Sequence, residues 1–133
     1  MRDLPERAAR AGVSVKILDD LSQAGPFDLV LCDVPCSGSG AWRRSPEGKW
    51  RLTETALHEI CELQQGILSQ GARLVRQGGA LAYATCSLLK VENAGQVETF
   101  LSCNPSWQLN KSRDFTAIES GDGFHVSVLT QKI

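Results

Sequence analysis

Residues 27–40 read FDLVLCDVPCSGSG. The first six are almost continuously apolar, which is typical of a buried strand in a parallel sheet. Asp33 follows at once, and Pro35 restricts the backbone of the turn by fixing its own φ angle. Two glycines near the end of the stretch leave room for the close approach of a bulky group. The pattern predicts a strand that ends in a rigid turn, with Asp33 and Cys36 facing a ligand. The alternative is a plain strand-to-loop turn with an incidental cysteine.

Strands and helices alternate along the rest of the chain. The apolar patterns predict helices over residues 3–11, 53–76 and 91–101, and strands over residues 13–18, 27–32, 80–84 and 124–129. The pair Gly78-Gly79 is expected to end the long central helix. Such alternation indicates a single α/β domain with a parallel or mostly parallel sheet, whose ligands bind at the carboxyl ends of the strands.

Polar clusters follow three of the predicted strands. They are Asp19-Asp20, residues 33–40 and Thr85-Cys86-Ser87. In a parallel sheet all three would lie at the carboxyl edge, so Cys86 would face the same crevice as Cys36. Two thiols and a carboxylate around one pocket are suited to covalent catalysis.

The composition limits the class of protein. Of the 133 residues, 42% are hydrophobic and 22% are charged, as in a globular soluble domain. No apolar run approaches the roughly 20 residues needed to cross a membrane, and the N-terminus lacks the apolar core of a signal peptide. We therefore expect a cytoplasmic protein with no membrane partner.

The chain contains five cysteines, an odd number with irregular spacing. Without a secretory signal these thiols should stay reduced. The cysteines and histidines do not form the close pairs that zinc sites use, so no metal is expected. A lone cysteine is more often a small buried hydrophobe than a nucleophile. That interpretation suits Cys32, Cys61 and Cys103.

The net charge of -1 argues against a broad basic surface for nucleic acid. Any RNA contact must therefore be local. A small cluster after the glycine-rich turn consists of Arg43, Arg44, Lys49 and Trp50. Its cations could hold phosphates and its indole could stack on an unpaired base. Charge runs are more often solvated faces, and Trp50 could instead pack on the long helix.

Four motifs follow one another along the chain: FDLVLCDVPCSGSG at 27–40, RRSPEGKW at 43–50, YATCS at 83–87 and DGF at 122–124. In this order they resemble the NOL1/NOP2/Sun family of RNA cytosine-C5 methyltransferases, which includes bacterial enzymes of the RsmB type that act on ribosomal RNA. The likeness runs from about Val13 to the C-terminus, and only residues 106–121 carry little signal. It implies a Rossmann-like methyltransferase fold, S-adenosylmethionine as the methyl donor and ribosomal RNA as the partner.

The resemblance also implies roles for single residues. Cys86 would attack C6 of cytosine, which gives C5 the electron density to accept a methyl group. Cys36 would help to release the methylated product. Asp33 would pair with the protonated N3 of the base and stabilise the adduct. The cofactor contacts implied by the resemblance are Asp19, Asp33 and Pro35.

The sequence departs from the family pattern at its N-terminal side. No G-x-G-x-x-G motif occurs in the 133 residues, and the first two strands of the methyltransferase sheet are absent as well. We therefore interpret residues 1–133 as the C-terminal part of a catalytic domain and expect this part alone to be inactive. The strand over residues 27–32 would then have an unpaired edge, which predicts a homodimer or strand exchange.

Three alternatives use the same residues differently. A DNA-type cytosine methyltransferase would use Cys36 as its nucleophile, and Cys86 would then have no role. An amino-methyltransferase would want an aromatic residue in place of Cys36. A non-catalytic RNA-binding or interaction remnant would explain the missing glycine motif, whereas the retained thiols and Asp33 speak against it.

Overall fold

A computed structural model describes residues 3–116, 118 and 121–132. Its helices are α1 (Leu4–Arg10), α2 (Glu47–Arg51), α3 (Glu54–Leu74) and α4 (Ala94–Cys103), with short 3-10 turns η1 (Ser39–Ala41) and η2 (Lys90–Glu92). Its strands are β1 (Phe27–Asp33), β2 (Val75–Thr85), β3 (Trp107–Phe115) and β4 (Phe124–Gln131). An α/β architecture is therefore present, as the alternating apolar patterns predict.

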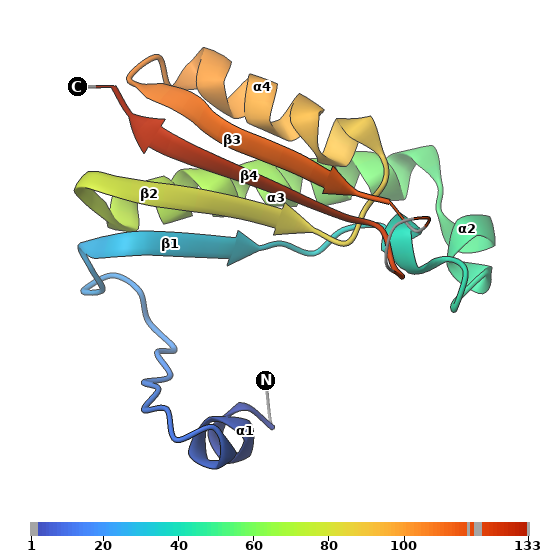
Figure 1. The fold of residues 1–133 in the computed structure, drawn as a ribbon. Coiled ribbons are helices and arrows are strands. Elements are labelled where there is room, and N and C mark those ends of the chain that lie inside the picture. The colour runs from blue at the N-terminus through green and yellow to red at the C-terminus, as the bar shows by residue number, and fades with distance from the viewer. Residues whose placement is uncertain (1–2, 117, 119–120, 133) are drawn as a thin grey trace.

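The four strands form one mixed sheet in the order β1-β2-β4-β3. Strands β1 and β2 run parallel, whereas β2 pairs with β4, and β3 with β4, in antiparallel fashion. The expectation of a mostly parallel sheet is thus wrong for two of the three pairings. Both differences come from β3, which the apolar patterns do not predict. Because β3 and β4 form a hairpin, β4 runs back alongside β2 in the antiparallel direction. Helices α3 and α4 both lie on one side of this sheet (Figure 1).

Helix α3 begins at a well-defined cap and ends without a linker. The Thr53 side chain accepts a hydrogen bond from the Ala56 N–H at 3.2 Å, which satisfies one of the free donors of the first turn. The helix stops at Leu74, and β2 starts at the next residue. The predicted helix end at Gly78-Gly79 is therefore wrong, because this pair lies inside β2.

The core lies between the sheet and the two long helices. Its fully buried apolar side chains are Leu68 of α3, Leu81 and Tyr83 of β2, Phe100 of α4 and Leu129 of β4. Each such side chain contributes roughly 1.5–3 kcal/mol through removal of apolar surface from water. This packing fixes the C-terminal ends of β1 and β2 against α3.

The opposite face of the sheet carries no helix among the described residues (Figure 1). Leu29 and Leu31 of β1 are 60% and 63% exposed on this face. Strand β1 also forms an edge of the sheet, since it pairs only with β2 within the described part of the chain. A bare face and a bare edge agree with the prediction of an incomplete sheet.

The predicted strand over residues 13–18 is wrong. This segment is exposed and has no regular secondary structure. A strand needs a neighbour that accepts its hydrogen bonds, and none of the described strands pairs with this segment. Apolar and polar residues alternate there, but alternation alone cannot supply the partner.

Within the described residues, no helix has the length and apolar character required to span a lipid bilayer.

Candidate functional site

The turns after β1 and β2 bring two thiols together. The two strands are parallel neighbours with Asp33 opposite Ala84, and the Val34 N–H continues the ladder with a bond to the Ala84 carbonyl at 3.1 Å. Both chains therefore leave the sheet side by side. The sulfur atoms of Cys36 and Cys86 lie 3.3 Å apart, both half-buried and both free thiols.

A third segment, at Gly123, reaches the two cysteine turns through contacts with Gly40. The Gly40 N–H donates to the Cys86 carbonyl at 3.0 Å, and the Gly40 carbonyl accepts from the Gly123 N–H at 2.9 Å. A Cβ atom at position 40 would lie 2.1 Å from the Gly123 carbonyl oxygen, so the backbones can meet only at a glycine. Three of the four sequence motifs thus converge at one end of the sheet.

A buried carboxylate lies behind the two thiols. The Glu92 side chain is fully buried, and it accepts hydrogen bonds from the hydroxyls of Ser37 and Ser87, each at 2.5 Å. It also accepts from the Ser37 N–H at 2.8 Å and from the Gln64 amide at 3.2 Å. Each serine directly follows one of the two cysteines. Sequence reasoning missed Glu92 because its contacts are 55, 28 and 5 positions away along the chain.

Further buried hydrogen bonds connect this carboxylate to the core. Gln64 of α3 donates to the Pro35 carbonyl at 2.9 Å and accepts from the Tyr83 hydroxyl at 3.2 Å. The Tyr83 hydroxyl also lies 2.6 Å from the Glu92 carbonyl oxygen, a bond that joins β2 to η2. Burial, followed by the nearby charge of Glu92, raises the pKa of Tyr83, so this hydroxyl stays a donor. Both cysteine turns are therefore anchored to the packed interior.

The Cys36 thiol lies in an environment that disfavours its charged form. Burial raises the pKa of Cys36 to about 12, and the adjacent Cys86 adds to this shift. Removal from water disfavours the charged thiolate, so Cys36 keeps its proton at neutral pH. The site thus contains at least one thiol that is held in the neutral form.

The predicted cofactor residues do not all lie at one place in the structure. Asp33 and Pro35 are exposed beside the thiols. Asp33 also lines a cavity of about 200 Å³ together with Leu31, Ile67 and Gly71. Asp19 lies in the exposed segment before β1, which runs away from the sheet towards α1 (Figure 1). The structure does not bring the Asp19-Asp20 cluster to the edge of the thiols, since the strand that would place it there is not formed. The role of Asp19 as a cofactor contact stays a prediction.

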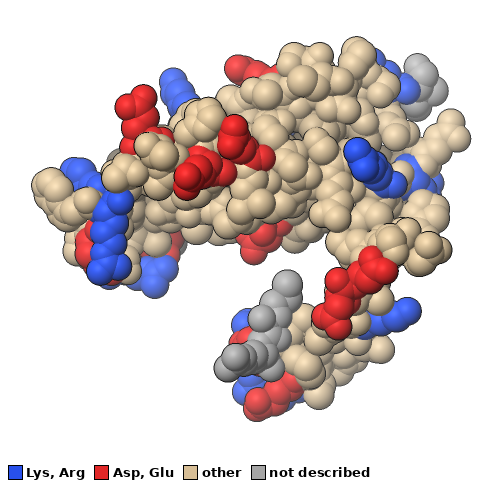
Figure 2. All heavy atoms as spheres, turned by 180° about the vertical axis from the view of Figure 1, so that it is seen from behind, with Lys and Arg blue, Asp and Glu red and all other residues tan. Residues whose placement is uncertain are grey.

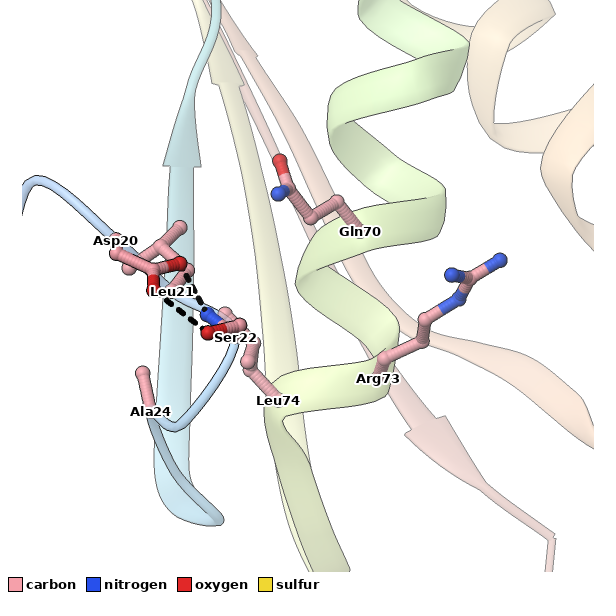
Figure 3. Close-up of a pocket in the computed structure, with 7 residues that line it drawn as sticks. All are labelled: Asp20, Leu21, Ser22, Ala24, Gln70, Arg73 and Leu74. Atoms are coloured by element: carbon pink, nitrogen blue, oxygen red, sulfur yellow. Dashed lines mark hydrogen bonds between the residues drawn. The ribbon is translucent and has the colours of Figure 1, made fainter.

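Asp20 instead contributes to a separate hollow beside β1 and α3. Its carboxylate accepts hydrogen bonds from the Ser22 N–H and hydroxyl at 2.8 and 2.6 Å, and these bonds lower the pKa of Asp20. Gln70, Arg73 and Leu74 of α3 line the other side of this hollow of about 420 Å³ (Figure 3). The carboxylate of Asp20 is thus engaged by its own loop rather than by the thiol site.

The predicted RNA contacts lie around η1 and α2, next to the thiol site. Figure 2 shows Lys and Arg side chains at this end of the molecule. Arg44 is held by Asp122 through hydrogen bonds from both Nε and Nη2, so its charge is paired. Trp50 is 82% exposed, which shows that it does not pack on α3. The Lys49 ammonium lies 5.6 Å from the centre of the Trp50 ring, in range of a cation–π contact.

Comparisons with known proteins agree with this arrangement. The family described as 16S rRNA methyltransferase RsmB/F matches residues 7–132. Ribosomal RNA small subunit methyltransferase B of Sodalis glossinidius is 42% identical over 106 residues, which cover 74% of this chain and 24% of that protein. The probable enzyme of the same name from Synechocystis is 43% identical over 102 residues, or 71% of this chain and 23% of that protein. The chain therefore spans about a quarter of the length of these relatives.

Solved structures give the same result for the fold. The crystal structure of PH0851 matches with a TM-score of 0.88 and 32% identity, over 98% of this chain and 34% of that one. NSun6 from Pyrococcus horikoshii with SFG matches with a TM-score of 0.76 and 23% identity, over 98% of this chain and 38% of that one. A methyltransferase homologue from Pyrococcus horikoshii matches with a TM-score of 0.79 and 22% identity, over 98% of this chain and 50% of that one. These likenesses confirm the predicted Rossmann-like methyltransferase fold.

Proposed function

The chain belongs to the RsmB/F family of 16S rRNA methyltransferases, and from this premise we propose that residues 1–133 form the C-terminal part of a catalytic domain that methylates C5 of a cytosine in ribosomal RNA. S-adenosylmethionine would supply the methyl group when bound. The observation that carries the proposal is the 3.3 Å separation of the Cys36 and Cys86 sulfur atoms at the carboxyl ends of two parallel strands. Substrates of open α/β sheets bind at this edge.

Cys86 is proposed as the nucleophile. Its thiolate would add to C6 of the cytosine, and the electron density that this shifts towards C5 would let C5 accept the methyl group. S-adenosylmethionine would supply that group when bound and would leave as S-adenosylhomocysteine. Loss of the C5 proton to water then re-forms the C5–C6 double bond and expels the Cys86 sulfur. Asp33 would stay close to the protonated N3 of the ring and stabilise the adduct.

Cys36 is proposed to act in the release step. A thiol whose pKa is raised to about 12 is a poor nucleophile at neutral pH but can still donate a hydrogen bond. At 3.3 Å from the Cys86 sulfur, it can donate that bond to the departing thiolate. The raised pKa of Cys36 therefore speaks against Cys36 as the attacking group.

The residues present fit one part of the cofactor. The cavity beside Asp33 combines a carboxylate with the apolar residues Val30 and Ile67, which suits the polar edge and flat face of an adenosine group. Pro35 and Asp19 are proposed as further contacts, and Asp19 would reach the site once a strand over residues 13–18 has a sheet neighbour. The methionine end would depend on a glycine-rich loop that these 133 residues do not contain.

The RNA is proposed to reach the thiols across η1 and α2. Arg43 and Lys49 can neutralise phosphates there, and the exposed Trp50 can stack on an unpaired base. Arg44 would act mainly through its bond to Asp122, which ties the basic loop to the Gly123 turn. A target cytosine must be unstacked before it can reach half-buried thiols.

The test is covalent trapping with an RNA that contains 5-fluorocytosine, because fluorine at C5 blocks release of the adduct. We would use the chain extended at its N-terminus to the length of its relatives, together with S-adenosylmethionine. Loss of the adduct in Cys86→Ala but not in Cys36→Ala is the expected result. Loss in Cys36→Ala alone would move the protein to the DNA-type mechanism. If the unsubstituted protein, which has both thiols, forms no adduct, the result would favour the non-catalytic remnant.

A further inference from the structure

The two cysteine turns share one buried anchor. We propose that Glu92 is a positioning residue whose carboxylate sets the separation of the Cys36 and Cys86 thiols, by binding the residue that follows each of them. The inference rests on the proposed function for its consequence in catalysis, whereas its geometric part concerns the chain alone. Glu92 touches neither sulfur, so it acts through Ser37 and Ser87.

The carboxylate is used to its full capacity. Its Oε2 atom accepts both serine hydroxyls at 2.5 Å, and its Oε1 atom accepts the Ser37 N–H and the Gln64 amide at 2.8 and 3.2 Å. An ionised carboxylate offers about four acceptor positions, and four donors fill them here. A fully buried carboxylate without such partners would be costly, so the donors and Glu92 stabilise one another.

The remaining links between the turns are of a different kind. On the other side, the Gly40 N–H binds the Cys86 carbonyl at 3.0 Å and the Leu88 N–H binds the Ser39 hydroxyl at 2.8 Å. The Ser37 and Ser87 hydroxyls also lie 3.4 Å apart, and the Ser39 hydroxyl lies 3.0 Å from that of Ser87. These links join neutral groups, whereas Glu92 is the carboxylate that accepts the hydroxyls of both residues that follow the cysteines. Without it the turns stay connected but can tilt, which moves the thiols apart.

The length of the side chain matters as much as its charge. In Glu92→Asp the charge is kept but the carboxylate is withdrawn by one methylene, so it cannot reach both serines. In Glu92→Gln the reach is kept, and the amide can donate to the serine hydroxyls while its oxygen accepts from the Ser37 N–H. Charge-assisted hydrogen bonds are roughly twice as strong as neutral ones, so Gln should preserve the geometry only in part.

The geometric test uses the 133-residue chain and a bifunctional bromobimane, which fluoresces fully when both arms have alkylated neighbouring thiols. Cys61→Ser and Cys103→Ser remove the other accessible thiols, and Cys36→Ser gives the background. We expect the bridging rate to fall about tenfold in Glu92→Asp and less in Glu92→Gln, since loss of a buried charge-assisted bond is worth about one decade. Ser37→Ala removes one arm of the anchor without burying a new charge, so it serves as a second variant if Glu92→Asp does not fold.

A matched control is available between α3 and α4. Gln65 of α3 binds the carbonyl and side chain of Gln96 at 2.8 and 2.7 Å and touches neither cysteine turn. Gln65→Ala should lower the melting temperature but leave the bridging rate unchanged. Equal bridging rates in the parent chain and in both Glu92→Asp and Ser37→Ala would overturn the inference.

The catalytic consequence is read on the extended protein with unmodified RNA. If Glu92 places Cys36 for release, Glu92→Gln should lower kcat with little change in KM and should accumulate the covalent RNA adduct. A fall in kcat without accumulation would refute this consequence. If the protein with Glu92 and both thiols forms no adduct even with 5-fluorocytosine RNA, the proposed function fails, and the bromobimane result still decides the geometric inference.

Discussion

The Cys36 and Cys86 sulfur atoms lie 3.3 Å apart although 50 positions separate the two residues in the sequence. Their meeting follows from the parallel pairing of β1 and β2, because parallel strands end at the same edge of the sheet. Each turn is then held from the inside by Glu92. The pair therefore follows from the pairing of the two strands and from this buried anchor.

The first prediction concerns the reactivity of Cys36. Its pKa is raised to about 12 by burial, so in Cys86→Ser the remaining thiol should react with iodoacetamide at pH 8 at least ~10-fold more slowly than an exposed cysteine such as Cys103. The raised pKa also means that the folded state keeps a proton which the unfolded state loses near pH 9. Stability from this group is thus complete below pH 9 and is lost as the pH rises towards 12. Mass spectrometry of single-thiol variants measures the alkylation rate, and equal rates for Cys36 and Cys103 would contradict the prediction.

The sequence predicts the strands and the helix that place the two thiols. The predicted strands before Asp33 and before Thr85 are both present. Because parallel strands end at the same edge of a sheet, the two apolar runs are enough to predict that the two thiols lie close together. The long helix is also found, since its cap and its apolar spacing are local signals. Each of these inferences uses information that lies within a few residues.

The features that the sequence does not predict depend on residues that lie far apart along the chain. Strand β3 has mostly polar, exposed residues and exists because β4 lies beside it, so no apolar run marks it. The segment over residues 13–18 has the right alternation but no neighbour. Glu92 could have been suspected from one cue only, an acidic residue shortly after Ser87, and its second serine lies 55 positions away. Pairing and burial over such separations cannot be read from periodicity.

The second prediction concerns the contact between Gly40 and Gly123. In Gly40→Ala the new methyl group would meet the Gly123 carbonyl oxygen at 2.1 Å and the Cys86 carbonyl at 2.9 Å, so the backbone must shift. We expect the free energy of unfolding to fall by about 1–3 kcal/mol, as in other overpacked sites. Gly66→Ala is the control, because a Cβ atom there meets nothing within 4 Å on α3, and it should stabilise by about 0.5–1 kcal/mol. Urea denaturation measures both, and a neutral Gly40→Ala would show that the segments do not meet.

The third prediction separates the two adjacent arginines. Asp122 holds the Arg44 guanidinium, and the same hydrogen bonds lower the pKa of Asp122. Arg43 is therefore freer to contact phosphate. Arg43→Ala should lower the slope of log Kd against log salt for RNA by roughly 0.7–0.9, the value for one phosphate contact, whereas Arg44→Ala should leave the slope nearly unchanged. Fluorescence anisotropy of the extended protein at several salt concentrations gives both slopes. Equal losses would mean that RNA displaces Asp122.

The fourth prediction concerns the bare edge and face of the sheet. Strand β1 has one unpaired edge within the described residues, and its Leu29 and Leu31 side chains are 60% and 63% exposed. Unpaired apolar edges recruit other strands, so the 133-residue chain should form dimers or exchange strands as its concentration rises. Lysines on an edge strand oppose such pairing, and Leu29→Lys with Leu31→Lys should shift the chain towards monomer. Leu63 of α3 is 52% exposed, so Leu63→Lys adds one such charge away from this edge and should change nothing. Sedimentation velocity over a concentration series measures the outcome. A parent chain that stays monomeric throughout would show that this edge is protected without a partner.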